Sequence, residues 1–126
     1  MSELVVNIKR IMLFVSDVER CAEFYQDVFG LEPIEDGYIE NEWRELRAGD
    51  CNLAFHRALG PNGPVTEPTG SPNNPHKVVF FAGDVAGTRE ILASRGAEMD
   101  EVKVFGDVHM CDGSDPEGHR FQISNR

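Results

Sequence analysis

Two basic residues, Arg10 and Lys77, begin two similar segments of the chain, RIMLFVSD and KVVFFAGD. Each segment alternates with the two-residue period of a β-strand, so Arg10 shares a strand face with Met12 and Phe14, and Lys77 shares one with Phe81. Arginine binds a carboxylate or phosphate through paired hydrogen bonds, and lysine binds it as a point charge. The two cations could therefore hold one anionic group. A second interpretation stays open, in which each cation pairs with one of the 22 acidic side chains.

Other predicted strands add polar and aromatic residues to the same face. Alternation along NLAFHR and HRFQIS places His56 and Gln122 there, where both could add hydrogen bonds. Trp43 and the two phenylalanines could stack on a planar aromatic group or a cation, although core packing explains aromatics equally well. His109 and Cys111 point to the same side of their predicted strand. His109 could therefore face the cleft, or it could lie at an exposed strand edge. The predicted ligand-binding set is Arg10, Met12, Phe14, Trp43, His56, Lys77, Phe81, His109 and Gln122.

The elements that would position these residues occur twice, about 67 residues apart. Residues 8–15 alternate as a strand, Ser16 and Glu19 form a predicted capping box for a helix, and Gly30 ends that helix. Strands are predicted at 31–35, 43–47 and 52–57, with a turn at 36–37. The plan restarts with a strand at Lys77 and a helix capped by Asp84. Strands then follow at 97–104, 108–112 and 120–124.

Residues 58–76 hold three glycines and five prolines and almost no periodic apolar pattern, which indicates a connector. The sequence therefore predicts one α+β domain over residues 1–126. It consists of two βαβββ modules, residues 7–57 and 77–126, joined by the connector 58–76. A lone four-stranded unit leaves one sheet face bare, so the modules are expected to pair and curl a mixed sheet around a shared cleft. Such a cleft is the natural place for a small ligand.

The composition narrows the classes of partner. A formal net charge of -10 over 126 residues argues against binding to nucleic acid or to an anionic membrane surface. The amino-terminal apolar run is too short for a membrane span or a signal peptide, so a cytoplasmic location is expected. Cys21, Cys51 and Cys111 are odd in number and widely spaced, which indicates neither a disulfide framework nor a zinc knuckle.

Two segments, IMLFVSDVERCAEFYQDVFGLEP and DPEGHRFQIS, resemble the opening strand–helix and the closing hairpin of the vicinal oxygen chelate superfamily. This superfamily includes glyoxalases, bleomycin resistance proteins and ring-cleaving dioxygenases, and the resemblance implies a glyoxalase-like fold. It also implies that four positions, two in each module, hold a divalent metal. Those positions fall on Arg10, Ala54, Lys77 and Gln122, of which only Gln122 has a suitable lone pair.

The departure at these positions predicts a metal-free binding protein that sequesters a small organic ligand in the cleft between the modules, without a cofactor. The alternative is a metal-dependent lyase, isomerase or dioxygenase with one divalent ion. In that case a one-residue bulge would exchange Lys77 for His76, and the ligands would be His56, His76 and Gln122. Whether the protein is catalytic stays open at this point. The resemblance further implies a homodimer, because similar proteins commonly dimerise.

Overall fold

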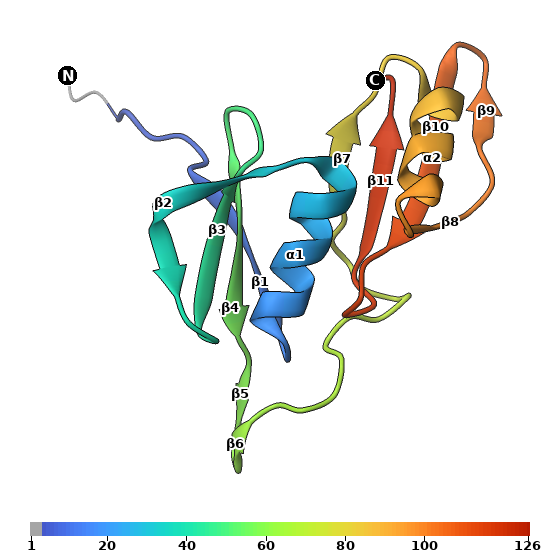
Figure 1. Ribbon diagram of the computed structural model, residues 1–126. Helices are drawn as coiled ribbons and strands as arrows, with labels where there is room; N and C mark the ends of the chain where they lie inside the picture. Colours follow the sequence, from blue (N-terminus) through green and yellow to red (C-terminus); the bar gives the residue numbers. More distant parts are fainter. Residues whose placement is uncertain (1–3) are drawn as a thin grey trace.

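The computed structural model describes residues 4–126. It confirms the predicted α+β architecture, in which a strand–helix unit followed by further strands occurs twice (Figure 1). The first module contains β1 (Arg10–Val15), α1 (Val18–Phe29), β2 (Glu32–Ile39), β3 (Trp43–Arg47) and β4 (Asn52–Arg57). The second contains β7 (Val78–Phe81), α2 (Val85–Ser94), β8 (Glu98–Met99), β9 (Lys103–Phe105), β10 (Val108–Ser114) and β11 (Arg120–Ser124).

The two modules have equivalent sheets. The first sheet has the order β1-β4-β3-β2, and the second has the order β7-β11-β10-β8, with β9 also paired to β10. In each sheet the first strand of the module runs parallel to the last, since β1 pairs with β4 and β7 pairs with β11. Strands β1 and β7 are therefore the corresponding edges of two separate sheets. Within residues 4–126 no helix has the length and apolar character needed to cross a membrane.

The N-terminus of α1 differs from the prediction in its capping residue. Asp17, rather than Ser16, is the N-cap, and its side chain accepts a hydrogen bond from Arg20 N. The Ser16 hydroxyl and backbone N–H instead donate to Glu117, which lies in the second module. Ser16 therefore bonds to a residue distant in sequence and does not cap the helix. The predicted end of the helix is confirmed, because Gly30 adopts the left-handed conformation with φ 73°.

The structure differs from two predicted strand boundaries and adds a hairpin to the connector. The expected turn at 36–37 does not form, because β2 continues through Gly37 with an irregularity in its pairing to β3. A Cβ at Gly37 would come within 2.8 Å of Glu45 Cβ, so the glycine permits close strand approach instead of a turn. The predicted strand 97–104 is divided into β8 and β9. The connector contains a small hairpin of β5 (Leu59–Gly60) and β6 (Gly63–Pro64).

Helix α1 packs against both sheets and so fixes the arrangement of the modules. The ring of Tyr25 stacks on that of Phe55 in β4, with 5.3 Å between ring centroids. One turn further on, Phe29 stacks on Phe80 of β7 at 4.3 Å. Figure 1 shows α1 beside the first sheet and next to β7 of the second. This packing leaves the opposite face of each sheet uncovered by either helix.

Candidate functional site

Arg10 lies at the start of β1, where its Nε donates to Glu45 Oε2 on β3 at 3.1 Å. The amide of Asn52, on β4, donates to the same oxygen at 2.9 Å. Glu45 is almost fully buried, and burial raises the pKa of its carboxyl, but the hydrogen bonds from Asn52 and Arg10 outweigh this effect and lower the pKa below its ordinary value. The carboxylate of Glu45 therefore stays charged and holds the Arg10 guanidinium in place.

The second module repeats this arrangement with different residues. Lys77 precedes β7, and its Nζ donates to Asp112 Oδ2 on β10 at 3.0 Å. Gln122 Nε2, on β11, donates to Asp112 Oδ1, also at 3.0 Å. Burial raises the pKa of Asp112, but the bonds from Gln122 and Lys77 lower it overall. Each predicted cation is therefore paired with a carboxylate of its own module, as the second interpretation of the sequence expects.

The four positions implied to hold a metal do not fit one chemically. Guanidinium has no lone pair, an ammonium must first lose its proton, and Ala54 has no donor atom. Within residues 4–126 no three His, Cys, Asp or Glu side chains are grouped so that they could hold an ion. The alternative ligands have separate partners: His56 bonds to the carbonyl of Arg57 and Gln122 bonds to Asp112. The structure does not join them to His76 in one group.

Aromatic side chains gather beside Arg10 on the uncovered face of the first sheet. His56 on β4 lies opposite Trp43 on β3 and Phe14 on β1 in the strand pairing. The ring centroid of His56 is 5.3 Å from Phe14 and 5.9 Å from Trp43. The Arg10 guanidinium lies 5.8 Å from the centroid of the Trp43 ring. Four predicted ligand-binding residues are thus neighbours, and we refer to Phe14, Trp43 and His56 as the aromatic triad.

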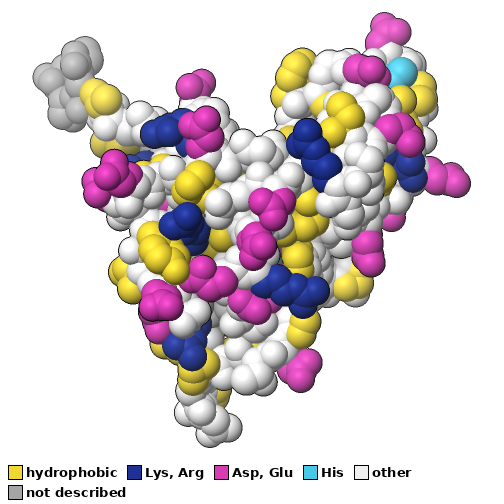
Figure 2. Space-filling model, viewed as in Figure 1, with side chains coloured by type: hydrophobic (Ala, Val, Ile, Leu, Met, Phe, Trp, Pro, Cys, Tyr) yellow, Lys and Arg dark blue, Asp and Glu magenta, His cyan; other side chains and the backbone are white. Residues whose placement is uncertain are grey.

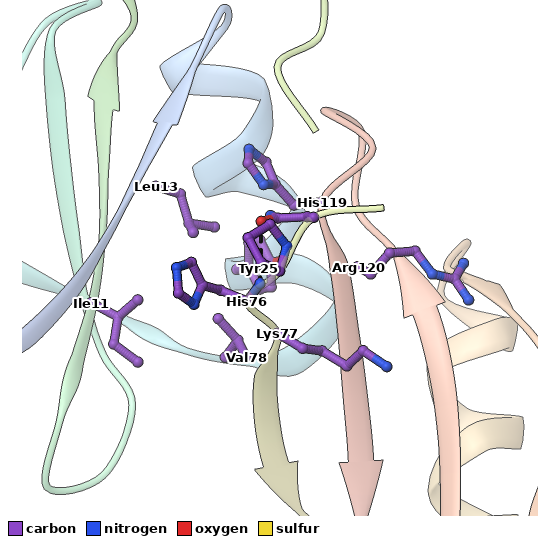
Figure 3. Close-up of a pocket in the computed structure, with 10 residues that line it drawn as sticks. Ile11, Leu13, Tyr25, His76, Lys77, Val78, His119 and Arg120 are labelled. Atoms are coloured by element: carbon purple, nitrogen blue, oxygen red, sulfur yellow. Dashed lines mark hydrogen bonds between the residues drawn. The ribbon is translucent and has the colours of Figure 1, made fainter. Parts of the chain in front are cut away.

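A groove runs between the two modules along the edge of β1. One of its two adjoining cavities, of about 420 Å³, is lined by β1, α1, the end of the connector and the start of β7 and β11. The other, of about 590 Å³, extends along β1 as far as Phe14. Figure 3 shows the His76 ring directed toward Ile11 and Leu13 of β1. The residues common to both cavities are Ile11, Leu13, Asn74, Pro75, His76 and His119.

This groove combines predicted and unpredicted residues. Met12, Phe14 and Lys77, which belong to the predicted ligand-binding set, line it together with His76, a ligand of the metal-dependent alternative. Ile11 shares the strand parity of the buried Val15, yet it is 42% exposed because the groove runs beside it. His119 lies in the closing turn between β10 and β11. No local pattern could reveal the role of either residue, because the groove depends on the path of the connector.

Two residues of the predicted set lie elsewhere. His109 shares its strand face with Cys111, which is buried in the core together with Val85 and Leu92 of α2. The prediction that places His109 in the cleft is therefore corrected, because the parity that it shares with Cys111 directs it to the helix side. Phe81 is 76% exposed and lines a separate cavity of about 390 Å³.

A buried polar junction lies next to Thr69, which lines the larger cavity of the groove. Glu117 is 3% exposed and accepts hydrogen bonds from Ser16 N at 2.8 Å, Asp17 N at 3.2 Å and Thr69 N at 3.2 Å. Burial raises the pKa of this carboxyl, but the bonds from Ser16, Thr69 and Asp17 lower it overall. Because Ser16 belongs to the first module, Thr69 to the connector and Glu117 to the second module, one carboxylate ties three parts of the chain together.

A neighbouring carboxyl ties α1 to the same turn. Tyr25 donates its hydroxyl proton to Asp115 Oδ2 at 2.8 Å. The other oxygen of Asp115 accepts from the backbone N–H groups of Glu117 at 2.9 Å and His119 at 3.0 Å. Burial raises the pKa of Asp115 above its ordinary value although these bonds oppose the change.

On the face shown in Figure 2, basic and acidic side chains are interspersed over both lobes of the molecule.

The fold, the duplicated first strands and the closing turn are those of one protein family. The chain belongs to the Glyoxalase/Bleomycin resistance protein/Dioxygenase superfamily, whose family model matches residues 7–123. No curated protein sequence matches the chain.

Solved structures share the whole fold. An antibiotic binding protein from a Streptomyces species, TnmS3, aligns with a TM-score of 0.72 at 18% identity, over 97% of this chain and 97% of its own. Lactoylglutathione lyase from Agrobacterium tumefaciens aligns with 0.65 at 18% identity, over 97% and 95%. A glyoxalase-related enzyme from Fulvimarina pelagi aligns with 0.69 at 22% identity, over 95% and 88%. At these identities the comparisons establish the fold.

Proposed function

We propose that the protein is a metal-free binding protein that sequesters a small organic molecule in the groove between its modules. The observation that carries this proposal is that each module contains an ion pair, Arg10 with Glu45 in the first and Lys77 with Asp112 in the second. A cation in each module occupies the place of a metal ligand, and a carboxylate from a neighbouring strand neutralises it. These positions are therefore filled by paired charges, and neither the guanidinium nor the ammonium offers a metal ion a lone pair.

The groove supports the proposal by its size and lining. Cavities of about 420 and 590 Å³ lie within the range of small-molecule sites in proteins. The walls combine an apolar strand edge, Ile11 to Phe14, with imidazoles and amides from the connector and the closing turn. TnmS3, which shares the fold, is named as an antibiotic binding protein, and this supports a binding role. The metal-dependent alternative has no comparable support, since His56 and Gln122 have separate partners and are not grouped with His76.

Metal analysis and ligand screening together test the proposal. The protein, purified without chelators after growth with added zinc and nickel, is expected to hold far less than one equivalent of either metal. Thermal shifts are then measured across a library of small organic compounds. Ile11→Trp, which would obstruct both cavities, should abolish the shifts. Ile39→Trp, at a site 61% exposed on β2, should leave them unchanged. Stoichiometric metal, or shifts that survive Ile11→Trp, would contradict the proposal.

We also propose that the protein acts as a homodimer. The uncovered sheet faces expose large apolar side chains, with Phe14 54% exposed, Val79 51% and Phe81 76%. Exposed apolar surface of this kind marks a protein interface or a ligand site. Sedimentation equilibrium should give twice the chain mass for the wild type, and Phe81→Ser should shift the equilibrium toward monomer. A monomer at all concentrations of the wild type would refute the dimer.

A further inference from the structure

The orientation of one imidazole indicates the chemical class of the ligand. We propose that His56 Nε2 accepts a hydrogen bond from a hydroxyl group of an aromatic ligand, while Phe14 and Trp43 contact the aromatic ring. The ligand class is therefore neutral phenols. This inference rests on the proposed function, because it specifies the compound that the cleft binds.

The hydrogen bond of the other ring nitrogen determines the tautomer of His56. Nδ1 lies 2.8 Å from the carbonyl oxygen of Arg57. A carbonyl oxygen can only accept, so Nδ1 must carry a proton and donate it. In the neutral imidazole the single proton is then on Nδ1, and Nε2 keeps its lone pair. Nε2 has no hydrogen-bond partner within residues 4–126. It is also not a fully buried atom, because the buried side-chain polar atom without a partner in that range is Nδ1 of His119. The lone pair is thus available to a donor from outside.

The surroundings of this lone pair suit an aromatic ring. Phe14 is inclined at 48° to the His56 ring, and Trp43 meets it edge-on at 78°. Phe14 is more than half exposed and also lines the larger cavity of the groove, so a ligand in that cavity can reach the aromatic triad. Aromatic side chains hold planar ligands by offset or edge contacts of this kind.

The charges beside the triad favour a neutral ligand. Arg10 is a cation beside Trp43, but its Nε is bonded to Glu45, and the guanidinium already lies near the Trp43 ring. The ion pair presents no net charge to a ligand, so neither a strong anion nor a strong cation gains a partner. A hydroxyl group offers the donor that Nε2 lacks without bringing a charge. Masking that hydroxyl as a methyl ether removes the donor and keeps the ring.

The test uses 4-methylphenol and its methyl ether, 4-methylanisole, as probes at about pH 8, where an ordinary imidazole is neutral and an ordinary phenol is protonated. Trp43 is the single tryptophan of the chain, so its indole N–H gives one signal in a ¹H–¹⁵N spectrum that reports on this site alone. Dissociation constants come from the shift of that signal on titration. The phenol is expected to bind roughly three- to tenfold more tightly than the ether, the value of one hydrogen bond.

Two variants assign the preference to His56. His56→Phe keeps an aromatic ring but removes Nε2, so the phenol should fall to the affinity of the ether. Phe14→Leu removes a ring and keeps the lone pair, so both probes should weaken while the preference for the phenol remains. The dispersion of the ¹H–¹⁵N spectrum and the urea midpoint of each variant establish that it is folded.

Each other result overturns the inference. Equal affinity for the two probes, or a preference that survives His56→Phe, would show that Nε2 is not the acceptor. An indole signal that neither probe moves would show that the aromatic triad is not the site. In these cases the proposed function stands if other compounds in the library still give thermal shifts that Ile11→Trp abolishes. If no compound gives such a shift, the proposed function itself fails.

Discussion

Glu117→Gln is expected to destabilise the protein, because Glu117 accepts hydrogen bonds from three parts of the chain. The substitution keeps the size and shape of the side chain but replaces one carboxylate oxygen by an amide NH₂ group. In the wild type, Oε1 accepts from the backbone N–H groups of Ser16 and Thr69, and Oε2 accepts from that of Asp17 and from the Ser16 hydroxyl. Three backbone donors thus converge on two oxygens.

The magnitude follows from the loss of one acceptor. The amide oxygen of the variant can replace Oε1, but the NH₂ group then faces the N–H of Asp17. Both groups are donors, so the N–H of Asp17 loses its acceptor. A donor left without a partner costs about 1–3 kcal/mol when it is buried. The bonds that remain lose the charge of the carboxylate, and charge-assisted hydrogen bonds are about twice as strong as neutral ones. Since Asp17 itself is partly open to solvent, we expect a loss of roughly 2 kcal/mol in the free energy of unfolding.

The assay is urea unfolding at pH 7, with Glu23→Gln as the control, since Glu23 is an exposed carboxylate on α1. The sign of the pH dependence is fixed by the pKa of Glu117, which is lowered from 4.5 in the folded state. The carboxylate therefore stabilises the fold fully above about pH 4.5, and this contribution is lost as the pH falls further. The difference in the free energy of unfolding between wild type and Glu117→Gln should therefore become smaller as the pH falls below about 4.5. A gap no larger than that of Glu23→Gln, or one constant down to pH 3, would refute this account of Glu117.

Three further substitutions are to be compared with matched controls by urea unfolding. Arg10→Ala leaves the buried carboxylate of Glu45 without its cation and should cost about 1–2 kcal/mol, whereas Arg47→Ala, whose ion pair is open to solvent, should cost less than about 1 kcal/mol. Tyr25→Phe removes a buried hydrogen bond and should cost about 1–3 kcal/mol, whereas the exposed Tyr38→Phe should be nearly neutral. Gly70→Ala places a Cβ against the backbone of Gly118 and should cost about 1–3 kcal/mol, whereas Gly83→Ala meets open space. A substitution that behaves as its control would contradict the contact assigned to it.

The sequence predicts the repeated plan well, because its strand and helix signals are local. Asp84 caps α2 and Gly30 ends α1 as expected, since capping depends on a few neighbouring residues. The alternation that places Arg10, Phe14 and His56 on one face is confirmed by their positions in the strand pairing. Local periodicity therefore identifies the residues that share a face, including the aromatic triad.

Features that depend on distant segments could not be predicted. Ser16 has the form of an N-cap, but Glu117, distant in sequence, takes its hydrogen bonds. Gly37 has the form of a turn residue, but its function is to let β2 approach Glu45. The connector gives no periodic signal, yet its course brings His76 against β1 and forms the groove. In each case a tertiary contact replaces the local structure that the residue type favours.

The duplication places the same kind of charge pair in both modules. A cation at the start of β1 or β7 faces the strand next to the last one of its sheet, where Glu45 and Asp112 hold equivalent places opposite Ala54 and Gln122. A carboxylate at that place neutralises the cation within its own module, and one amide, from Asn52 or Gln122, completes the set. Each cation is therefore paired within its own module. Under the proposed function, selectivity for a ligand would come from groups outside these pairs, above all the lone pair of His56 and the apolar edge of β1.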